Sequence, residues 1–177
     1  MAGHSDNVLD LPRFEAGTTV LIVIAPYYKD ISEAQLASAR AKIEAAGCAH
    51  ETIEVPGSLE LPTAIAMANR MGDYQGFVAL GCVIRGRTSH YDVVVNQSAN
   101  AIAMLGLQGL CIGNGIITVE SREQAEERAD ANRLDTAGAA AEAALHLMAL
   151  ERDLHDRKRD SGFGFTGTIL AKGGDTV

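Results

Sequence analysis

The segment at residues 85–90, RGRTSH, holds the richest set of side chains in this chain that could do chemistry. Gly86 would let a ligand come close to the backbone, and a helix starting here would point free N–H groups at an anion. Arg87 adds positive charge, and His90 titrates near neutral pH and can transfer protons. The segment indicates an anion site beside a proton-transferring group. The alternative is that its hydroxyls only cap the helix and that His90 is a polar surface residue.

Two further segments carry polar or aromatic side chains directly after a predicted strand. Tyr27 and Tyr28 follow the first strand, where a tyrosine ring could stack on a flat heterocycle and its hydroxyl could form a hydrogen bond. Ser58 and Glu60 follow the second strand, at the start of an expected helix. Each also has a structural explanation: a core or rim tyrosine, Ser58 as a helix cap, and Glu60 as an acidic residue favoured near a helix N-terminus. Taken alone, these structural explanations are the simpler ones.

Apolar runs that alternate with helical patterns must position these residues. Residues 20–24 (VLIVI) have the composition of a strand buried on both faces. The other predicted strands are residues 51–55, 76–84 and 110–119. Apolar residues at helical spacing follow each strand, and one more helix comes last. This order predicts an α/β fold with a parallel sheet, helices on both faces and right-handed crossovers.

The sequence also predicts where the helices begin and end, and where a ligand would bind. Ser32 and Ser121 each begin a capping-box spacing that predicts a helix start, and Gly47 predicts the end of the first helix. In a parallel sheet, ligands bind at the carboxyl ends of the strands. The expected site positions are therefore after Ile24, after Val55, after Ile84 and near residues 113–119.

The composition excludes several classes of protein. The 177 residues include 15 Lys and Arg against 23 Asp and Glu, a net charge of −8, whereas nucleic-acid binding needs clustered positive charge. Trp is absent and aromatic residues make up 5%, which speaks against stacking on single-stranded nucleic acid. Apolar residues make up 47%, enough to bury a core. We expect one globular domain with no nucleic-acid partner.

Neither a membrane segment nor a secretion signal is expected. Residues 20–25 form the longest strongly aliphatic run, and a bilayer span takes roughly 20 apolar residues. The first ten residues lack a basic start followed by an apolar stretch. Cys48, Cys82 and Cys111 are odd in number and lack a CxxC spacing, which favours free thiols over disulfides or a zinc site. These features predict a cytoplasmic protein without a membrane partner.

The two ends of the chain differ from its centre. We expect an N-terminal arm at residues 1–16, one domain at residues 17–152, and a charged, then Gly-rich tail at residues 153–177 that is disordered or appended. Residues 162–167 spell GxGxxG, the pattern of a dinucleotide-binding turn. They follow a charged helix end rather than a strand, so we do not expect a dinucleotide site there.

Read together, three segments resemble the 6,7-dimethyl-8-ribityllumazine synthase family. They are residues 55–62 (VPGSLELP), residues 81–92 (GCVIRGRTSHYD) and residues 114–129 (NGIITVESREQAEERA). The resemblance extends over roughly residues 17–152 in order and spacing, and the second segment is its most specific part.

This resemblance implies the penultimate step of riboflavin synthesis, in which a ribitylaminopyrimidine condenses with 3,4-dihydroxy-2-butanone 4-phosphate. Phosphate and water leave and the lumazine ring closes, without a metal or organic cofactor. The implied fold is a flavodoxin-like three-layer α/β/α sandwich with a four-stranded parallel sheet. The implied assembly is a homopentamer with sites between subunits, and in some members twelve pentamers form a hollow shell.

The resemblance also assigns roles to residues of this chain. His90 would be the catalytic proton shuttle for imine formation and phosphate loss. Tyr27 would stack on the pyrimidine, residues 58–60 would hold that substrate, and the backbone of residues 82–84 would line it. The implied substrate-binding residues are Tyr27, Ser58, Leu59, Glu60, Cys82, Val83, Ile84, Arg87, Thr88, Asn114 and Arg128.

Within this set, Arg87, Thr88 and Arg128 would hold the phosphate, since Arg suits bidentate phosphate contacts. Asn114 would touch substrate from the adjoining subunit, and it stands where many members have an aromatic ring. A Thr-Ala pair at residues 136–137 replaces the usual Lys-Gly pair, so a lysine near the phosphate is missing. The Gly-rich turn frequent in shell-forming members is also absent, which favours a free pentamer.

Two hypotheses from other classes remain beside the enzyme. One is a non-catalytic binder of lumazines or flavins on the same scaffold, and the other is a shell-forming structural protein. The presence of His90, Arg87, Thr88 and Arg128 argues against the binder. An activity assay separates the enzyme from the binder, and native mass separates a pentamer from a shell.

Overall fold

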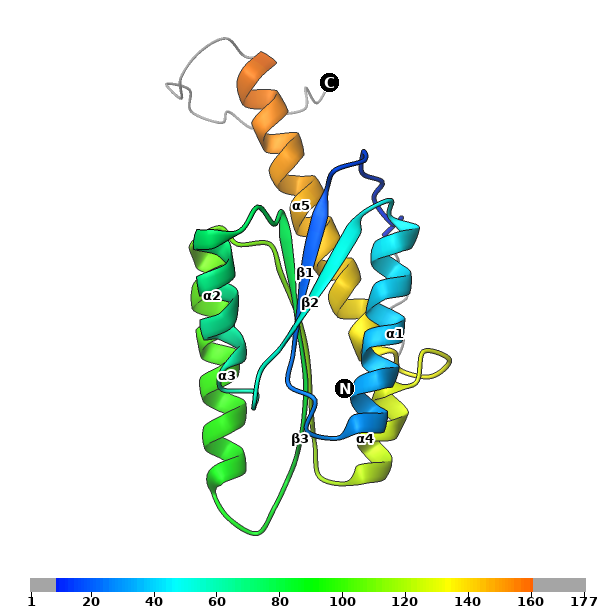
Figure 1. Ribbon diagram of the computed structural model, residues 1–177, viewed down its shortest axis with the longest axis vertical. Coiled ribbons are helices and arrows are strands. Elements are labelled where there is room, and N and C mark those ends of the chain that lie inside the picture. The colour runs from blue at the N-terminus through cyan, green and yellow to red at the C-terminus, as the bar shows by residue number, and fades with distance from the viewer. Residues whose placement is uncertain (1–8, 161–177) are drawn as a thin grey trace, which may run out of the picture.

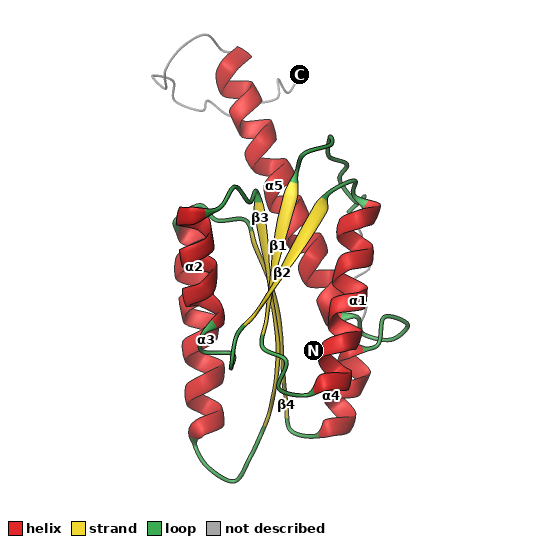
Figure 2. Ribbon diagram, in the orientation of Figure 1, coloured by secondary structure: helices red, strands yellow, loops and turns green. Residues whose placement is uncertain are grey.

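The computed structural model describes residues 9–160, which form three layers around a central sheet (Figure 1). The elements are β1 (Thr19–Ile24), α1 (Lys29–Ala45), β2 (Ala49–Glu54), α2 (Leu61–Met71), β3 (Gly76–Ile84), α3 (His90–Leu107), β4 (Ile112–Val119), α4 (Arg122–Ala129) and α5 (Thr136–Asp160). All four strands are parallel. Figure 2 shows α2 and α3 on one face of the sheet and α1, α4 and α5 on the other. The predicted fold class and order of elements are confirmed.

The order of strands in the sheet sets the position of the site. The strands lie in the order β2-β1-β3-β4, so the chain passes from β1 outward to β2 and then returns past β1 to β3. The connections after β1 and after β3 therefore leave toward different faces of the sheet. At such a point the carboxyl ends of two neighbouring strands leave a crevice between them, which is where ligands bind in open parallel sheets.

Small and branched side chains hold the layers together. Residues 20–24 of β1 are fully buried, as expected for a central strand covered on both faces. On one face, α5 packs closely on β4: a Cβ at Gly113 would overlap the carbonyl oxygen of Ala140. The predicted sheet-facing side of α5 is confirmed, because all its members are buried: Ala137, Ala140, Ala141, Ala144 and Met148.

Two of the three predicted helix signals are confirmed and one is wrong. Gly47 adopts a φ of 86° and ends α1, and Ser121 caps α4 by accepting a hydrogen bond from the N–H of Gln124 at 3.4 Å. Ser32 does not start α1, which begins at Lys29. The Ser32 hydroxyl instead lies inside the first turn and donates to the carbonyl of Tyr28 at 2.8 Å.

Two boundaries near the end of the chain also differ from prediction. The fourth strand begins at Ile112 rather than at residue 110. Residues 153–160 continue α5 as its last two turns, so the described part of the predicted tail is helical rather than disordered. The GxGxxG pattern at residues 162–167 lies outside the described residues. Within the described residues, no helix has the length and apolar character to cross a membrane.

Candidate active site

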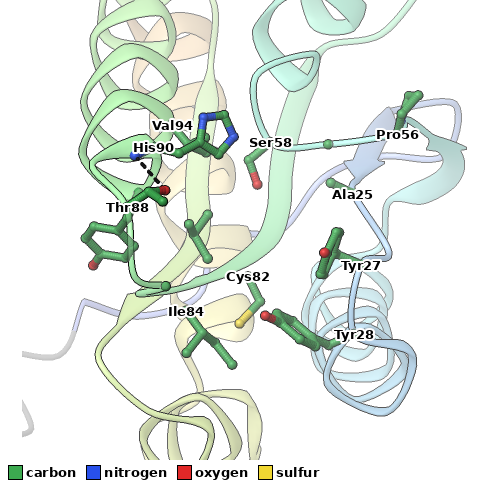
Figure 3. A pocket seen from close by; sticks show the side chains of 14 residues that line it. Ala25, Tyr27, Tyr28, Pro56, Ser58, Cys82, Ile84, Thr88, His90 and Val94 are labelled. Carbon is green, nitrogen blue, oxygen red and sulfur yellow. Dashed lines mark hydrogen bonds between the residues drawn. The ribbon is translucent and has the colours of Figure 1, made fainter.

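A cavity of about 310 Å³ lies at the carboxyl ends of β1 and β3, beside the loop that follows β2. This is the crevice that the strand order creates. Figure 3 shows its walls: tyrosines after β1 on one side, the start of α3 on the other, and the end of β3 between them. Seven of the twelve predicted catalytic and substrate-binding residues line it: Tyr27, Ser58, Cys82, Val83, Ile84, Thr88 and His90.

The loop after β2 brings Ser58 close to the end of β3. The side chain of Ser58 is buried, and a Cβ at Gly81 would lie 2.9 Å from the Ser58 hydroxyl oxygen. Gly81 is therefore needed for this approach, since any side chain there would push the hydroxyl away. The result is a hydroxyl group fixed at the upper wall of the cavity, within reach of a polar group on a bound molecule.

A buried glutamine connects β3 and β4 near this part of the cavity. Gln35 of α1 is fully buried, and its Nε2 donates to the carbonyls of Gly81 at 3.2 Å and Gly115 at 2.9 Å. One side chain thus links β3 and β4 at the level where the cavity begins. This role of Gln35 was not predicted, because a Gln among Ala and Ser residues on a helix gives no signal of burial.

Two tyrosine rings form the wall after β1. Tyr27 is 74% exposed, whereas Tyr28 is partly buried, and the two rings meet edge to face with centroids 5.0 Å apart. Burial raises the pKa of the Tyr28 hydroxyl, so this group remains a hydrogen-bond donor at neutral pH. Both tyrosines predicted after the first strand therefore line the cavity, although the family resemblance assigned a role only to Tyr27.

Cys82 lines the bottom of the cavity at the end of β3. Figure 3 shows its sulfur pointing toward the hydroxyl of Tyr28. Burial raises the pKa of the Cys82 thiol to about 11, so the thiol stays protonated near neutral pH. A protonated thiol is a poor nucleophile, which makes Cys82 a packing surface here rather than a reactive group.

The loop between β3 and α3 forms the opposite wall. The Thr88 hydroxyl accepts a hydrogen bond from the backbone N–H of His90 at 3.4 Å. The His90 ring lies beside Ser58 in Figure 3, and within the described part of the chain it makes no hydrogen bond or ion pair. A solvent-accessible imidazole at the first residue of a helix is thus left available to a ligand in the cavity.

Five of the predicted site residues do not line the cavity. Leu59 and Glu60 lie on the exposed side of the loop before α2, and Arg87 projects from the loop before α3. Asn114 on β4 is exposed, and its Oδ1 accepts from the N–H of Ile116 at 3.1 Å. Arg128 on α4 donates to the carbonyl of Gln124 at 3.1 Å.

Between residues 9 and 160, no group of three or more His, Cys, Asp or Glu side chains is arranged to hold a metal ion. The groups that face the cavity are hydroxyls, an imidazole, aromatic rings and strand-end backbone. This set suits a flat heterocycle on the tyrosine side and a polar or anionic group at the start of α3.

Comparison with known proteins shows the family of the chain. A sequence model of the 6,7-dimethyl-8-ribityllumazine synthase family matches residues 17–152. The protein of that name from Jannaschia sp. strain CCS1 is 69% identical over 169 residues, which cover 96% of this chain and 95% of that one. The one from Sphingopyxis alaskensis is 52% identical over 75% of this chain and 94% of its own. The chain belongs to the 6,7-dimethyl-8-ribityllumazine synthase family.

Proposed function

We propose that this chain condenses 5-amino-6-(D-ribitylamino)uracil with 3,4-dihydroxy-2-butanone 4-phosphate to give 6,7-dimethyl-8-ribityllumazine, phosphate and water. This is the penultimate step of riboflavin biosynthesis. Membership of the family supports the reaction. The observation that carries the proposal is the cavity itself, where strand-end segments far apart in the sequence bring seven expected site residues to one place. Nothing observed favours a non-catalytic binder or a structural shell protein.

The pyrimidine ring fits between the tyrosines and the end of β3. Tyr27, together with Tyr28, offers a ring face for stacking, and the backbone of residues 82–84 lines the ring. The Ser58 hydroxyl is placed to bind a polar edge of the substrate. Leu59 and Glu60 lie on the same loop, where the Glu60 carboxylate suits the hydroxyls of a ribityl chain.

The phosphate of the second substrate fits at the start of α3. The Thr88 hydroxyl lines the cavity there, and Arg87 lies on the same loop without an ion pair among the described residues. A helix N-terminus favours an anion. His90 then has the position of the proton shuttle: it would remove a proton as the imine forms and assist the loss of phosphate. Holding two substrates side by side supplies much of the rate enhancement.

A second copy of the chain completes this site. Asn114 and Arg128 lie on β4 and α4 and do not line the cavity of their own chain. We assign them to the site of a neighbouring copy, where Arg128 would add to the phosphate contacts. Arg128 now donates to the carbonyl of Gln124 and lies 3.8 Å from the carboxylate of Glu127, so binding phosphate requires a change of side-chain rotamer that breaks both contacts.

The assembly we propose is a homopentamer. Apolar side chains are exposed on the outer side of α2 and α3, where a monomer would leave them in water. They are Met67, Met71, Val93, Met104 and Leu107. Native mass spectrometry should give a dominant species of five chains. A megadalton particle that persists across salt and pH would contradict the pentamer and indicate a shell.

We also place the protein in the cytoplasm. Cys48, Cys82 and Cys111 are all free thiols and all buried. Free cysteines are typical of proteins in a reducing compartment. Fractionation of cells that produce the full chain, followed by immunodetection, tests this placement.

The reaction is tested by mixing the two substrates with the purified chain and following the absorbance of the lumazine product. Omitting either substrate should abolish the signal. Production of lumazine above the rate without protein supports the proposal. A folded chain that binds the pyrimidine but leaves this rate unchanged would overturn the enzyme and leave the non-catalytic binder.

A further inference from the structure

The side chain of Arg85 joins three parts of the chain at the base of the loop between β3 and α3. Its Nη2 donates to Asp92 Oδ1 at 3.1 Å, and its Nε lies 2.8 Å from Glu120 Oε2. Its guanidinium carbon lies 4.0 Å from the centroid of the Tyr91 ring. The backbone N–H of Arg85 donates to the carbonyl of Val119 at 2.9 Å. The end of β3, the start of α3 and the end of β4 therefore meet at one residue.

These contacts close the loop at residues 86–89. Arg85 lies immediately before the loop, and Tyr91 and Asp92 lie in the first turn of α3, just after it. Glu120 ties the same guanidinium to the next strand end. The planar, five-donor guanidinium can bind two carboxylates and stack on a ring at the same time, which an ammonium group cannot do. The loop is thus fixed at both ends by one side chain.

Arg85 and Arg87 flank Gly86 but differ in what they bind. The positive charge of Arg85 is neutralised by two carboxylates, and its side chain does not line the cavity. Arg87 has no hydrogen bond or ion pair within residues 9–160. Two carboxylates already occupy Nε and Nη2 of Arg85, whereas no carboxylate among the described residues occupies the guanidinium of Arg87.

We propose that Arg85 is a positioning residue, which holds the loop at residues 86–89 so that Thr88 and His90 stay against the cavity. This inference rests on the proposed function, because it assigns that loop to the phosphate-bearing substrate. Arg85 acts through its contacts with Asp92, Glu120 and Tyr91. Without them the glycine-containing loop has more conformations to lose when substrate binds.

Steady-state kinetics with each substrate varied in turn tests the inference. Arg85→Met should raise the KM for the butanone phosphate between about tenfold and a hundredfold, as expected when a binding loop shifts by about 1 Å. The KM for the pyrimidine should stay within about twofold, because Ser58, Tyr27 and Tyr28 lie on other segments of the chain than this loop. Arg85→Lys should recover only part of the loss. A general loss of structure would raise both KM values together, and that result would overturn the proposal.

A double-mutant cycle separates positioning from direct binding. Glu120→Gln should raise the same KM, and adding it to Arg85→Met should have little further effect, because both changes break one interaction. If Glu120→Gln and Asp92→Asn are neutral while Arg85→Met is not, Arg85 binds the phosphate directly and the inference is wrong. Arg159→Met is the matched control, since Arg159 pairs with Asp156 at 3.8 Å near the end of α5.

Hydrogen exchange tests the loop without relying on activity. The amides of residues 86–89 should exchange faster in Arg85→Met and in Glu120→Gln than in the starting chain, and Arg159→Met should leave them unchanged. Unchanged exchange in Arg85→Met would overturn the inference even if the chain makes lumazine. Faster exchange in a chain that makes no lumazine would overturn the proposed function and leave Arg85 as the residue that holds the loop.

Discussion

The carboxyl ends of β1 and β3 differ from the region of β4 and α4 in what they contribute to the expected site. The first region gathers its side chains around one cavity, among them Ser58, Thr88 and His90. The second holds Asn114 and Arg128, whose polar side-chain atoms hydrogen-bond to nearby backbone of their own segments. One chain therefore presents the cavity at one place and, at another, the two residues that we assign to the site of a neighbouring copy. The proposal of a site shared between identical copies accounts for this difference.

The largest effect is expected from the first region. His90→Ala should lower kcat by about 10²–10⁴-fold without abolishing turnover, because general acid–base help is lost while the positioning of both substrates remains. Steady-state rates of lumazine formation measure this. His155→Ala is the control, since His155 is an exposed histidine on α5 that lies 4.0 Å from Glu151. An unchanged kcat in His90→Ala would remove His90 from the mechanism.

A smaller effect is expected from the second region. Arg128→Ala should raise the KM for the butanone phosphate by about 10- to 150-fold, the loss expected for one hydrogen bond to a charged group at about 1.5–3 kcal/mol. Arg133→Ala is the control, because Arg133 also pairs with Glu127, at 3.0 Å, and we assign it no substrate. A collapse of pyrimidine affinity with unchanged use of the phosphate substrate would show that Arg128 has been assigned to the wrong substrate.

Gly81 tests the packing that shapes the cavity wall. Gly81→Ala should destabilise the fold by about 1–3 kcal/mol, because the new methyl group meets the Ser58 hydroxyl at 2.9 Å. The same change in a Ser58→Ala background should cost less, since the obstructing oxygen is gone. Urea unfolding of the four proteins measures both values. An equal cost in the two backgrounds would mean that Ser58 is not the obstacle.

The smallest effect concerns two buried thiols, Cys82 in β3 and Cys111 just before β4. Burial raises the pKa of Cys82 to about 11 and that of Cys111 to about 12, so both should react slowly with iodoacetamide at pH 8. Bound pyrimidine should slow the alkylation of Cys82 severalfold and leave that of Cys111 unchanged. Mass spectrometry of the labelled peptides measures both rates. Equal slowing of alkylation at Cys82 and Cys111 would mean that the pyrimidine binds elsewhere or makes both thiols less accessible at once.

The raised pKa values of these two thiols also predict how the stability of the fold changes with pH. A thiol whose pKa is higher in the folded chain than in the unfolded one keeps its proton longer when folded. Its contribution to the free energy of unfolding is therefore complete below about pH 9 and is lost as pH rises toward about 11 for Cys82 and about 12 for Cys111. Urea unfolding at pH 8 and pH 10 should give the lower stability at pH 10.

The sequence was sufficient to predict the fold and the location of the cavity. Continuous apolar runs marked the buried strands, because a strand covered on both faces has no polar positions. The parallel order then placed residues 85–90 at a carboxyl end, where they lie in the structure. The family resemblance of residues 81–92 predicted several side chains that line one cavity in the structure.

What the sequence did not predict depends on contacts between distant segments. Ser32 has a capping-box spacing, yet α1 begins at Lys29 and the hydroxyl bonds back to Tyr28 inside the helix. Residues 153–160 have a composition that suits a tail, but the helix continues through them, and the side chains of residues 153–159 are exposed. The contacts of Gln35 and Arg85 with residues far along the chain leave no local pattern to detect.

Mixing two variants tests most directly whether one site is built from two chains. His90→Ala and Arg128→Ala should be unfolded together, refolded as an equal mixture, and assayed at a butanone phosphate concentration below its KM. Each variant alone should be weakly active, and the mixture should recover about a quarter of normal activity, since one interface in four would pair an intact His90 with an intact Arg128. The chain that carries both substitutions should rescue neither single variant when the two are refolded together. A mixture no more active than the average of its two components would contradict the shared site.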